Sequence, residues 1–437
     1  MAVTAAALGD TLESVVGRNY LISDPLRLTS YAVDGSVPRW VAAPGHVEEV
    51  GALLRLAFDE RLAVVPRGTG ERMELGNLPG RVDLVLDCSR LSAEVAYEPD
   101  DLTITVRAGL SLEALSARLA PRRQFLPLDP LVGSSRSLGG VVATNDSGPL
   151  RLRYGTARDL LLGVRFVQAD GTVTFGGARV VKSVTGYDIP KLLVGSLGTL
   201  GILVELTLRL HPMVEAEAHW LVSFPSAERA GAFLAGIVDS ALQPSRLELL
   251  NGEALIGLAL PHAPAAVAVT VGSVPPAVRS QGEALLTLAA RDGGEVRALP
   301  DGGLWRRLGR LLAGALLVKV VTAPALTAEM LSSVDELARG LGLRARVLAE
   351  AGDGVLHVAL TGDLSPEQWE RSVILPLRDW VGPEGGSVVV EAAPQPLKAR
   401  LDVWGPIEPG VLAVMRRLKA EFDPRGILNP GRFVDRM

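Results

Sequence analysis

Residues 137–145 read Ser-Leu-Gly-Gly-Val-Val-Ala-Thr-Asn, and two further glycine-punctuated segments share their character: 66–70 reads Pro-Arg-Gly-Thr-Gly, and 195–202 reads Gly-Ser-Leu-Gly-Thr-Leu-Gly-Ile. Each segment follows or opens an apolar run, so each predicts a tight backbone turn attached to a strand or helix. Because glycine has no side chain, the N–H groups of such turns can come close to an anion. One loop of this kind is weak evidence. Three in the first half of the chain predict a site for one large anionic cofactor.

A purely structural explanation competes with this one, because glycines also serve sharp turns between strands and helices. The first loop does not fit a dinucleotide-binding βαβ unit, since no helical pattern follows Gly70 before the next strand. In the second segment, Ser137 has the character of an N-cap for a helix that starts at Leu138, and such a helix end can face a phosphate. In the third, Gly198 and Gly201 leave room for a flat ring.

Length and composition narrow the class of protein. A chain of 437 residues predicts two or three domains, and 48% hydrophobic residues predict a large buried interior. Its single cysteine, Cys88, excludes an internal disulfide and a cysteine-ligated iron–sulfur cluster within the chain. A net charge of −5 argues against nucleic acid as a partner. Met1–Gly9 does not resemble a signal peptide, and the apolar run Leu311–Leu326 is too short to span a bilayer, so we expect a cytoplasmic protein without a transmembrane segment.

Hydrophobic periodicity predicts an α+β fold. In the first half it predicts a helix over 44–60, strands over Leu62–Val65, Asp83–Asp87 and Leu102–Arg107, a helix over Ser111–Leu119, a hairpin turn at 169–172 and a long strand over Leu200–Leu210. Pro212 ends that strand, and we place a domain boundary there. Beyond it, strand patterns at Trp220–Phe224, Ala266–Val271, Val355–Leu360 and Val388–Val390 alternate with helix patterns near 226–238, 276–292 and 327–341. This alternation predicts an antiparallel sheet with helices on one side.

Several motifs carry a resemblance to a known family. They are Val64–Gly70, Leu84–Leu91, Pro127–Pro130, Leu138–Gly140, Ala143–Asn145, Arg153–Thr156 and Gly195–Gly201, with Phe422–Pro424 and Ile427–Arg432 in the tail. Together they resemble FAD-linked oxidoreductases of the vanillyl-alcohol-oxidase type, whose FAD-binding domain is called PCMH-type. Within that family the chain is similar to the FAD-binding subunits of glycolate oxidases (glycolate dehydrogenases), through Ser147–Arg151, Lys182, Gly186–Asp188 and Asp402–Pro406.

The resemblance implies a two-lobed FAD-binding domain over residues 1–212, a cap domain over 213–408 and a C-terminal helix and loop over 409–437 that return to the FAD domain. It implies a pyrophosphate site at the first loop, phosphate and ribose contacts at the second, and a contact between Asn429 and the flavin. The cofactor-binding residues that it implies are Pro66, Arg67, Gly68, Thr69, Gly70, Glu71, Pro127, Asp129, Ser137, Leu138, Gly139, Gly140, Ala143, Thr144, Asn145, Ser147, Gly148, Gly198, Gly201, Ile202 and Asn429.

The first loop departs from the family pattern. That pattern usually reads Arg-Gly-Gly-Gly-Thr, whereas here Thr69 and Glu71 replace a glycine and the threonine. A carboxylate is repelled by a pyrophosphate, so we expect the Glu71 side chain to point away from it. Some family members tether the flavin through a His or Cys. No His lies between His46 and His211, and Cys88 belongs to the strand after the loop, so we expect noncovalent FAD.

Oxidation of a 2-hydroxy acid needs a base for the hydroxyl proton and an acceptor for the hydride. The resemblance implies metal ligands and a base in two stretches, His-Ala-Gly-Asp-Gly-Asn-x-His and Glu-His-Gly-Ile-Gly. In this chain Glu350 stands for the first His and Ala392 for the His of the second stretch, while His357 and Glu391 remain. Glu350, His357 and Glu391 are therefore candidates for a catalytic or metal site. The alternative is that they are structural groups on buried strands, and we expect no metal.

The resemblance also implies two partners: a paralogous FAD-containing glycolate oxidase subunit and a separate iron–sulfur subunit, through which the complex would lie peripheral to the inner membrane. Glycolate would be oxidised to glyoxylate, with electrons passing through flavin to the iron–sulfur partner. Because the usual base is replaced by Ala392, we favour oxidation by the paralogue and electron transfer or assembly by this chain. Two alternatives stay open: a stand-alone FAD-dependent dehydrogenase for D-lactate or another 2-hydroxy acid, and a structural subunit without catalysis.

Overall fold

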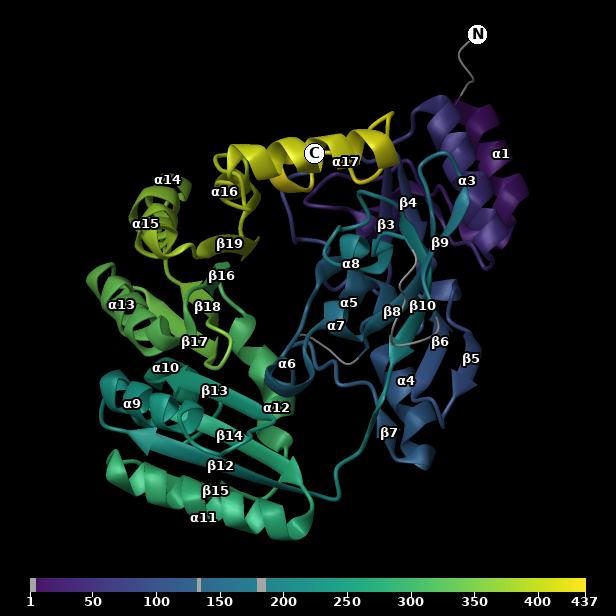
Figure 1. The fold of residues 1–437 in the computed structure, drawn as a ribbon. Helices are drawn as coiled ribbons and strands as arrows, with labels where there is room; N and C mark the ends of the chain where they lie inside the picture. The colour runs from purple at the N-terminus through teal and green to yellow at the C-terminus, as the bar shows by residue number, and fades with distance from the viewer. Residues whose placement is uncertain (1–4, 132–134, 179–185) are drawn as a thin grey trace. The chain divides into compact units, whose positions relative to one another are not determined.

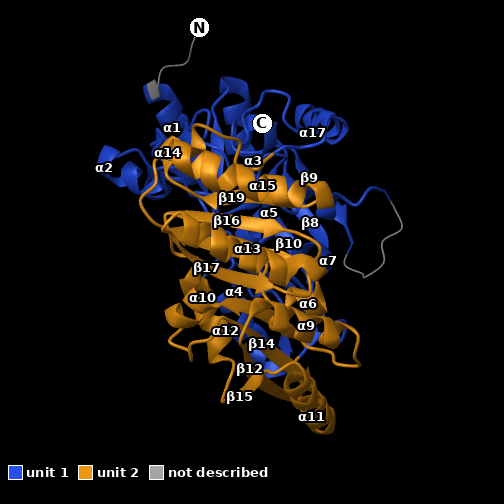
Figure 2. Cartoon of the chain, turned by 90° about the vertical axis from the view of Figure 1, so that its left-hand side faces the viewer, with its two compact units in different colours: residues 1–146, 156–212, 406–437 blue, residues 147–155, 213–405 orange. Residues whose placement is uncertain are grey.

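A computed structural model describes residues 5–131, 135–178 and 186–437. Lys182 and the start of Met1–Gly9 lie outside these residues. The chain forms two compact units, coloured separately in Figure 2: unit 1 comprises Met1–Asp146, Thr156–Pro212 and Pro406–Met437, and unit 2 comprises Ser147–Gly155 and Met213–Gly405. The domain limits inferred from the sequence, 212/213 and 408/409, stay a prediction.

The first lobe of unit 1 is built on a mixed sheet. Its strands lie in the order β1 (Leu21–Ile22), β2 (Trp40–Ala42), β4 (Leu84–Asp87) and β3 (Val64–Arg67), with β2 and β3 parallel to β4. The predicted helix over 44–60 is α3 (Val47–Glu60). Its periodic apolar residues, Val47, Val50, Leu53, Leu54 and Ala57, are buried in the same core as α1 (Ala5–Val16) and the sheet. Glu48 and Glu49 lie in the first turn of α3, where the helix dipole favours negative charge.

The second lobe of unit 1 is an antiparallel sheet in the order β5 (Glu94–Glu98), β6 (Thr103–Arg107), β10 (Ile202–Arg209), β8 (Leu161–Val167) and β9 (Val173–Gly177). Ser111 caps α4 (Leu112–Leu119) through a hydrogen bond from the Ala114 N–H, as its position before the apolar run predicts. The predicted hairpin is the β8–β9 turn, where Gly171 has a φ of 83°. These two sheets are the two lobes expected of a PCMH-type domain.

Unit 2 is built on a large antiparallel sheet. Its strands lie in the order β15 (Glu295–Leu299), β12 (Ala216–Phe224), β14 (Ala265–Ser273), β13 (Arg246–Asn251), β17 (Arg344–Glu350), β18 (Val355–Thr361), β16 (Leu316–Val321) and β19 (Ser387–Ala392). Alternate residues of these strands share one core with α9 (Ala227–Val238), α11 (Pro275–Arg291), α13 (Thr327–Gly340) and α15 (Leu375–Val381), so these helices cover one face of the sheet (Figure 1). The predicted α+β cap is thus confirmed.

The other face of this sheet carries a cluster of polar side chains among apolar ones. Because side chains alternate along a strand, residues between the core positions point to the side opposite the helices. They include Glu248 on β13, Glu350 on β17, His357 on β18, Lys319 on β16 and Glu391 on β19. Four of these, all but Lys319, are buried. The apolar run Leu311–Leu326 contains β16, and no helix in the described part of the chain is long and apolar enough to cross a membrane.

The C-terminal tail completes the first lobe of unit 1. After α17 (Pro409–Phe422), Leu428 forms a bridge to Val64 of β3, and the Asn429 N–H donates to the Val64 carbonyl. These contacts place Leu428 and Asn429 beside β3, and the domain role of residues 409–437 stays a prediction. The remaining short elements are α2 (Pro25–Leu28), β7 (Gln124–Phe125), α5 (Leu138–Thr144), α6 (Arg151–Tyr154), α7 (Ala157–Leu160), α8 (Ile189–Leu193), β11 (His211–Pro212), α10 (Gly252–Gly257), α12 (Gly303–Arg307), α14 (Pro366–Gln368) and α16 (Gln395–Lys398).

Candidate cofactor site

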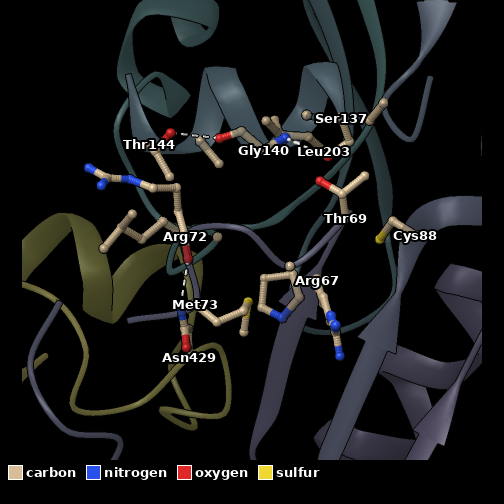
Figure 3. A pocket seen from close by; sticks show the side chains of 18 of the residues that line it. Arg67, Thr69, Arg72, Met73, Cys88, Ser137, Gly140, Thr144, Leu203 and Asn429 are labelled. Atoms are coloured by element: carbon tan, nitrogen blue, oxygen red, sulfur yellow. Dashed lines mark hydrogen bonds between the residues drawn. The ribbon is translucent and has the colours of Figure 1, made fainter. Parts of the chain in front are cut away.

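The three glycine segments meet around one pocket in unit 1. A Cβ atom on Gly68 would lie 1.9 Å from Ser137 Oγ, and one on Gly198 would lie 2.5 Å from Pro66 Cγ. The first loop therefore touches the other two segments at positions where no side chain fits. The pocket encloses about 840 Å³ of space, which includes the open solvent at its mouth. Figure 3 shows part of its lining, with Thr69 on the first loop, Ser137, Gly140 and Thr144 on or beside α5, and Asn429 on the tail.

Most of the residues expected to bind the cofactor line this pocket. They are Pro66, Arg67, Gly68, Thr69, Gly70, Glu71, Ser137, Gly139, Gly140, Ala143, Thr144, Gly198, Gly201, Ile202 and Asn429. Pro127, Asp129, Leu138, Asn145, Ser147 and Gly148 do not line it. Leu138 is fully buried in the apolar core of the second lobe. Ser147 and Gly148 belong to unit 2.

Several residues line the pocket that are not among the expected cofactor-binding residues, namely Arg72, Met73, Leu75, Cys88, Ala108, Arg136, Leu197, Leu203 and Arg432. Arg72 and Arg136 adjoin the first and second glycine segments, so a search for cations beside those segments would have found them. The residues next to Ala108 in the sequence do not mark it as part of a binding pocket. It lines the pocket because Gly139 packs against it, where a Cβ on Gly139 would lie 2.8 Å from that of Ala108.

The second segment has the local structure that its sequence predicts. Ser137 is the N-cap of α5, and its hydroxyl accepts a hydrogen bond from the Gly140 N–H at 3.3 Å. Thr144 donates to the Gly140 carbonyl at 2.8 Å, and its hydroxyl accepts from Arg136 Nη2 at 3.1 Å. The wall of the pocket along α5 is thus fixed by its own side chains and by Arg136.

Asn429 joins the tail to the third segment and presents an acceptor without a donor. Its Nδ2 donates to the Leu197 carbonyl at 2.7 Å, seen as a dashed line in Figure 3. The side chain is only 5% exposed, and its Oδ1 accepts no hydrogen bond within the described residues. A buried carbonyl oxygen without a donor costs free energy of folding. A bound group with N–H or O–H donors would satisfy it.

Two of the arginines that line the pocket direct their charge into the protein. Arg67 stacks over Tyr31, with its guanidinium carbon 4.3 Å from the ring centroid, and donates to the Ser30 carbonyl. Arg432 pairs with Asp34 at 2.9 Å and donates to the Met73 and Leu75 carbonyls. Burial lowers the pKa of Arg432, although Asp34 opposes this shift. These two arginines hold the pocket walls together.

Cys88 lines the pocket but is not a reactive thiol. Its side chain is buried and donates weakly to the Leu86 carbonyl. Burial, assisted by the nearby Asp87 carboxylate, raises the pKa of the Cys88 thiol to about 12. The thiolate is the nucleophilic form of cysteine, so this thiol is poorly suited to form a bond with a flavin. Noncovalent binding stays a prediction, and the state of Cys88 supports it.

The three catalytic candidates meet within unit 2. His357 Nδ1 lies 3.6 Å from Glu391 Oε2, and His357 Nε2 lies 3.9 Å from Glu350 Oε1. Arg151 Nη1 lies 3.3 Å from Glu350 Oε2 and connects it to Asp353, while Lys319 lies 3.9 Å from Glu391. The result is a cluster of ionisable side chains in which an arginine adjoins Glu350. Within the described residues, no group of three or more His, Cys, Asp or Glu side chains is arranged to hold a metal ion.

Comparison with known families agrees with this geometry. Residues 38–176 match the family model "FAD binding domain", and residues 214–375 and 406–433 match the model "FAD linked oxidases, C-terminal domain". The chain belongs to the FAD-linked oxidases. Its cofactor is FAD. The second match crosses from unit 2 into the tail that contains Asn429.

Individual relatives extend over most of the chain. The protein is 28% identical to the glycolate oxidase subunit GlcD of Bacillus subtilis over 419 residues, which covers 91% of this chain and 89% of that protein. It is 27% identical to the mitochondrial D-lactate dehydrogenase (cytochrome) of Arabidopsis thaliana over 451 residues, or 98% of this chain and 78% of the relative. A structure of p-cresol methylhydroxylase with substrate bound superposes with a TM-score of 0.78 at 15% identity, covering 98% and 97% of the two chains. This last likeness concerns the fold.

The pocket has the chemistry that FAD requires. Its glycine segments line it with backbone groups, Asn429 Oδ1 can accept from the N–H or O–H groups that a flavin and its ribityl chain carry, and arginines supply positive charge for a diphosphate. Side chains at Gly68 and Gly198 would separate the segments, and one at Gly139 would collide with Ala108. The residues present therefore fit the cofactor.

Proposed function

We propose that the protein is an FAD-binding subunit of a complex that oxidises a small 2-hydroxy acid, glycolate being the first candidate, to the corresponding 2-oxo acid. The pocket assembled from three glycine segments and Asn429 is the observation that carries this proposal. The glycolate oxidase subunit and the D-lactate dehydrogenase among the relatives support the substrate class, because both act on a hydroxyl next to a carboxylate.

In such an oxidation a flavin accepts the hydride that leaves the hydroxyl-bearing carbon. The protein must remove the hydroxyl proton and hold the carboxylate. In unit 2, both ring nitrogens of His357 face carboxylates, those of Glu391 and Glu350. Glu350 in turn lies beside Arg151. Because Ala392 stands where the related sequences have the histidine base, we propose that His357, Glu350 and Glu391 organise this polar cluster rather than act as the base.

Electrons must then leave the flavin toward a partner. Cys88 cannot ligate an iron–sulfur cluster by itself, and it is the only cysteine in the chain. We therefore propose that a paralogous FAD subunit removes the hydride from the substrate and that a separate iron–sulfur subunit receives the electrons, with the FAD of this chain in between. A second candidate, a stand-alone dehydrogenase for D-lactate, has the support of the Arabidopsis relative, which covers nearly the whole chain.

The bound cofactor of the isolated chain separates these possibilities. We expect purified protein to show flavin absorption and to release FAD on heating. We expect glycolate or D-lactate to leave this flavin oxidised under anaerobic conditions, while dithionite reduces it and serves as the control. Reduction by either acid without partners would establish the stand-alone enzyme in place of the electron-transfer subunit. Protein that is colourless and ignores added FAD would refute the cofactor site.

A pair of glycine variants tests the location of the site. Gly140→Leu places a large apolar side chain in the pocket wall, so we expect it to prevent FAD retention. Gly340→Leu is the matched control, because a Cβ at Gly340 would meet nothing within 4 Å. Equal flavin content in the two variants, with circular dichroism showing both folded, would contradict the assignment.

A further inference from the structure

A network of four charged residues lies beside the first two glycine segments, within unit 1. Arg136 Nη1 donates to Asp146, and Arg136 Nε lies 3.8 Å from Glu71 Oε2. Arg72 Nε lies 3.5 Å from Asp146 Oδ2. Glu71, Arg72 and Arg136 line the pocket. The carboxylates and guanidiniums therefore alternate in the order Glu71, Arg136, Asp146, Arg72.

The contact between Glu71 and Arg136 is the weakest link of this network. Glu71 Oε1 accepts from the Ser135 hydroxyl at 2.5 Å, so the carboxylate is anchored at one oxygen. Its Oε2 is buried and accepts no hydrogen bond among the described residues, and 3.8 Å from Arg136 Nε is longer than a hydrogen bond. By contrast, Arg136 makes direct hydrogen bonds to Asp146 and Thr144. Glu71 thus neutralises Arg136 without being firmly bound to it.

Arg136 is a cation that a phosphate group in this pocket can use. Its side chain is 3% exposed, so its charge is poorly screened by solvent. Two other arginines that line the pocket are held by neighbouring side chains. Arg67 stacks on Tyr31, and Arg432 forms an ion pair with Asp34. A guanidinium with one strong and one weak acidic partner can exchange the weak partner for a phosphate, since arginine binds both kinds of anion through the same N–H groups.

We propose that Glu71 is a built-in competitor of the cofactor: its carboxylate occupies Arg136 in the cofactor-free chain, and the diphosphate of FAD replaces it there. This inference rests on the proposed cofactor site. It explains how a carboxylate is accommodated in a loop that lines an anion-binding pocket, because Glu71 supplies the negative charge that Arg136 needs when FAD is absent. FAD binding is then an exchange of anions, and its affinity is lower than the pocket would otherwise provide.

Glu71→Gln tests the competition. Glutamine keeps an oxygen that can accept from Ser135, so the variant removes the charge with little change in shape. We expect the dissociation constant for FAD to fall about tenfold, and that for riboflavin, which has no phosphate, to stay unchanged. Binding is measured by the change in flavin fluorescence. Glu94→Gln is the matched control, because Glu94 pairs with Arg118 at 2.6 Å on the surface and does not line the pocket.

A double-mutant cycle identifies Arg136 as the object of the competition. We expect Arg136→Gln to weaken FAD binding about ten- to hundredfold, the range for loss of a hydrogen bond to a charged group. In the Arg136→Gln background, Glu71→Gln should bring no gain. A persisting tenfold gain would show that Glu71 merely repels FAD from a distance, and would overturn the proposal.

Other outcomes are equally decisive. If Glu71→Gln leaves FAD affinity unchanged, or tightens riboflavin as much as FAD, the competition is refuted while the cofactor site stands. If neither the natural chain nor Glu71→Gln binds FAD or riboflavin, the cofactor site itself is wrong. Should Arg136→Gln fail to fold, as judged by circular dichroism, the comparison of FAD with riboflavin in Glu71→Gln still decides the matter.

Discussion

Lys419 of α17 joins the tail to the third glycine segment, and its replacement tests how the pocket is held. Its ammonium donates to the Thr199 carbonyl at 2.9 Å, to the Leu428 carbonyl at 2.9 Å and to Asp423 Oδ2 at 2.7 Å. The lysine side chain is 13% exposed and that of Asp423 is fully buried. Burial lowers the pKa of Lys419, and the Asp423 carboxylate opposes that shift.

We expect Lys419→Met to destabilise unit 1 by about 3–5 kcal/mol, the range for removing one partner of a buried ion pair. The lower end applies because Asp423 still accepts from the Ile427 and Leu428 N–H groups, at 3.0 and 2.7 Å. Since Thr199 and Leu428 flank the contact between Asn429 and Leu197, their release also loosens the pocket. FAD affinity should therefore fall together with stability.

The assay is urea unfolding followed by circular dichroism, with FAD titration in parallel and hydrogen exchange at residues 197–201 and 427–429. Lys191→Met is the control, because Lys191 forms an exposed pair with Asp188 that is worth about 1 kcal/mol or less. The charge-balanced variant Lys419→Met with Asp423→Asn should recover part of the loss. If Lys419→Met behaves like Lys191→Met in all three measurements, the buried pair does not hold the pocket.

Two further predictions concern the pocket walls. Because the pKa of Cys88 is about 12 in the folded chain and near 8.5 when unfolded, only the unfolded state loses this proton at moderately alkaline pH; the free energy of unfolding should fall by about 1.4 kcal/mol per pH unit above pH ~9. In urea titrations at several pH values, the unfolding free energy of Cys88→Ala should lack this part of the pH dependence. An identical pH slope in the variant and the natural chain would contradict the prediction. Gly68→Ala should cost about 1–3 kcal/mol because its Cβ would lie 1.9 Å from Ser137 Oγ; the same change in a Ser137→Gly background should cost much less in thermal unfolding, and equal costs would show that the two loops do not touch.

Much of the fold follows from neighbours in the sequence. The helices α3 and α4, the N-cap Ser137 and the hairpin at Gly171 all lie where the residues beside them predict. These features depend on contacts within a few residues, so hydrophobic spacing and turn chemistry suffice to find them. The apolar run Leu311–Leu326 carries fewer local cues to its secondary structure. Strand β16, which lies within it, was not predicted from the sequence. Only pairing with β18 and β19 identifies it as part of the sheet.

The candidate site divides in the same way. The glycine segments predicted an anion-binding pocket. The tail motif of the family implied a role for Asn429, which lines this pocket. Pro127, Asp129 and Asn145 belong to the same motifs but do not line the pocket, because adjacency in a motif does not fix the direction of a side chain. Arg136 and Glu71 are 65 positions apart in the sequence, and no pattern couples them.

Residue types and spacing alone predicted turns able to hold an anionic cofactor and a sheet-and-helix second domain, and the family resemblance implied the two lobes of the first domain. Tertiary structure decided which charges meet in the pocket, that the Cys88 thiol is buried there, and that His357 lies between two carboxylates. The physical reason is the separation along the chain over which each kind of interaction acts. Helix caps and turns form between near neighbours, whereas ion pairs and burial depend on which distant segments the packing of the core brings together.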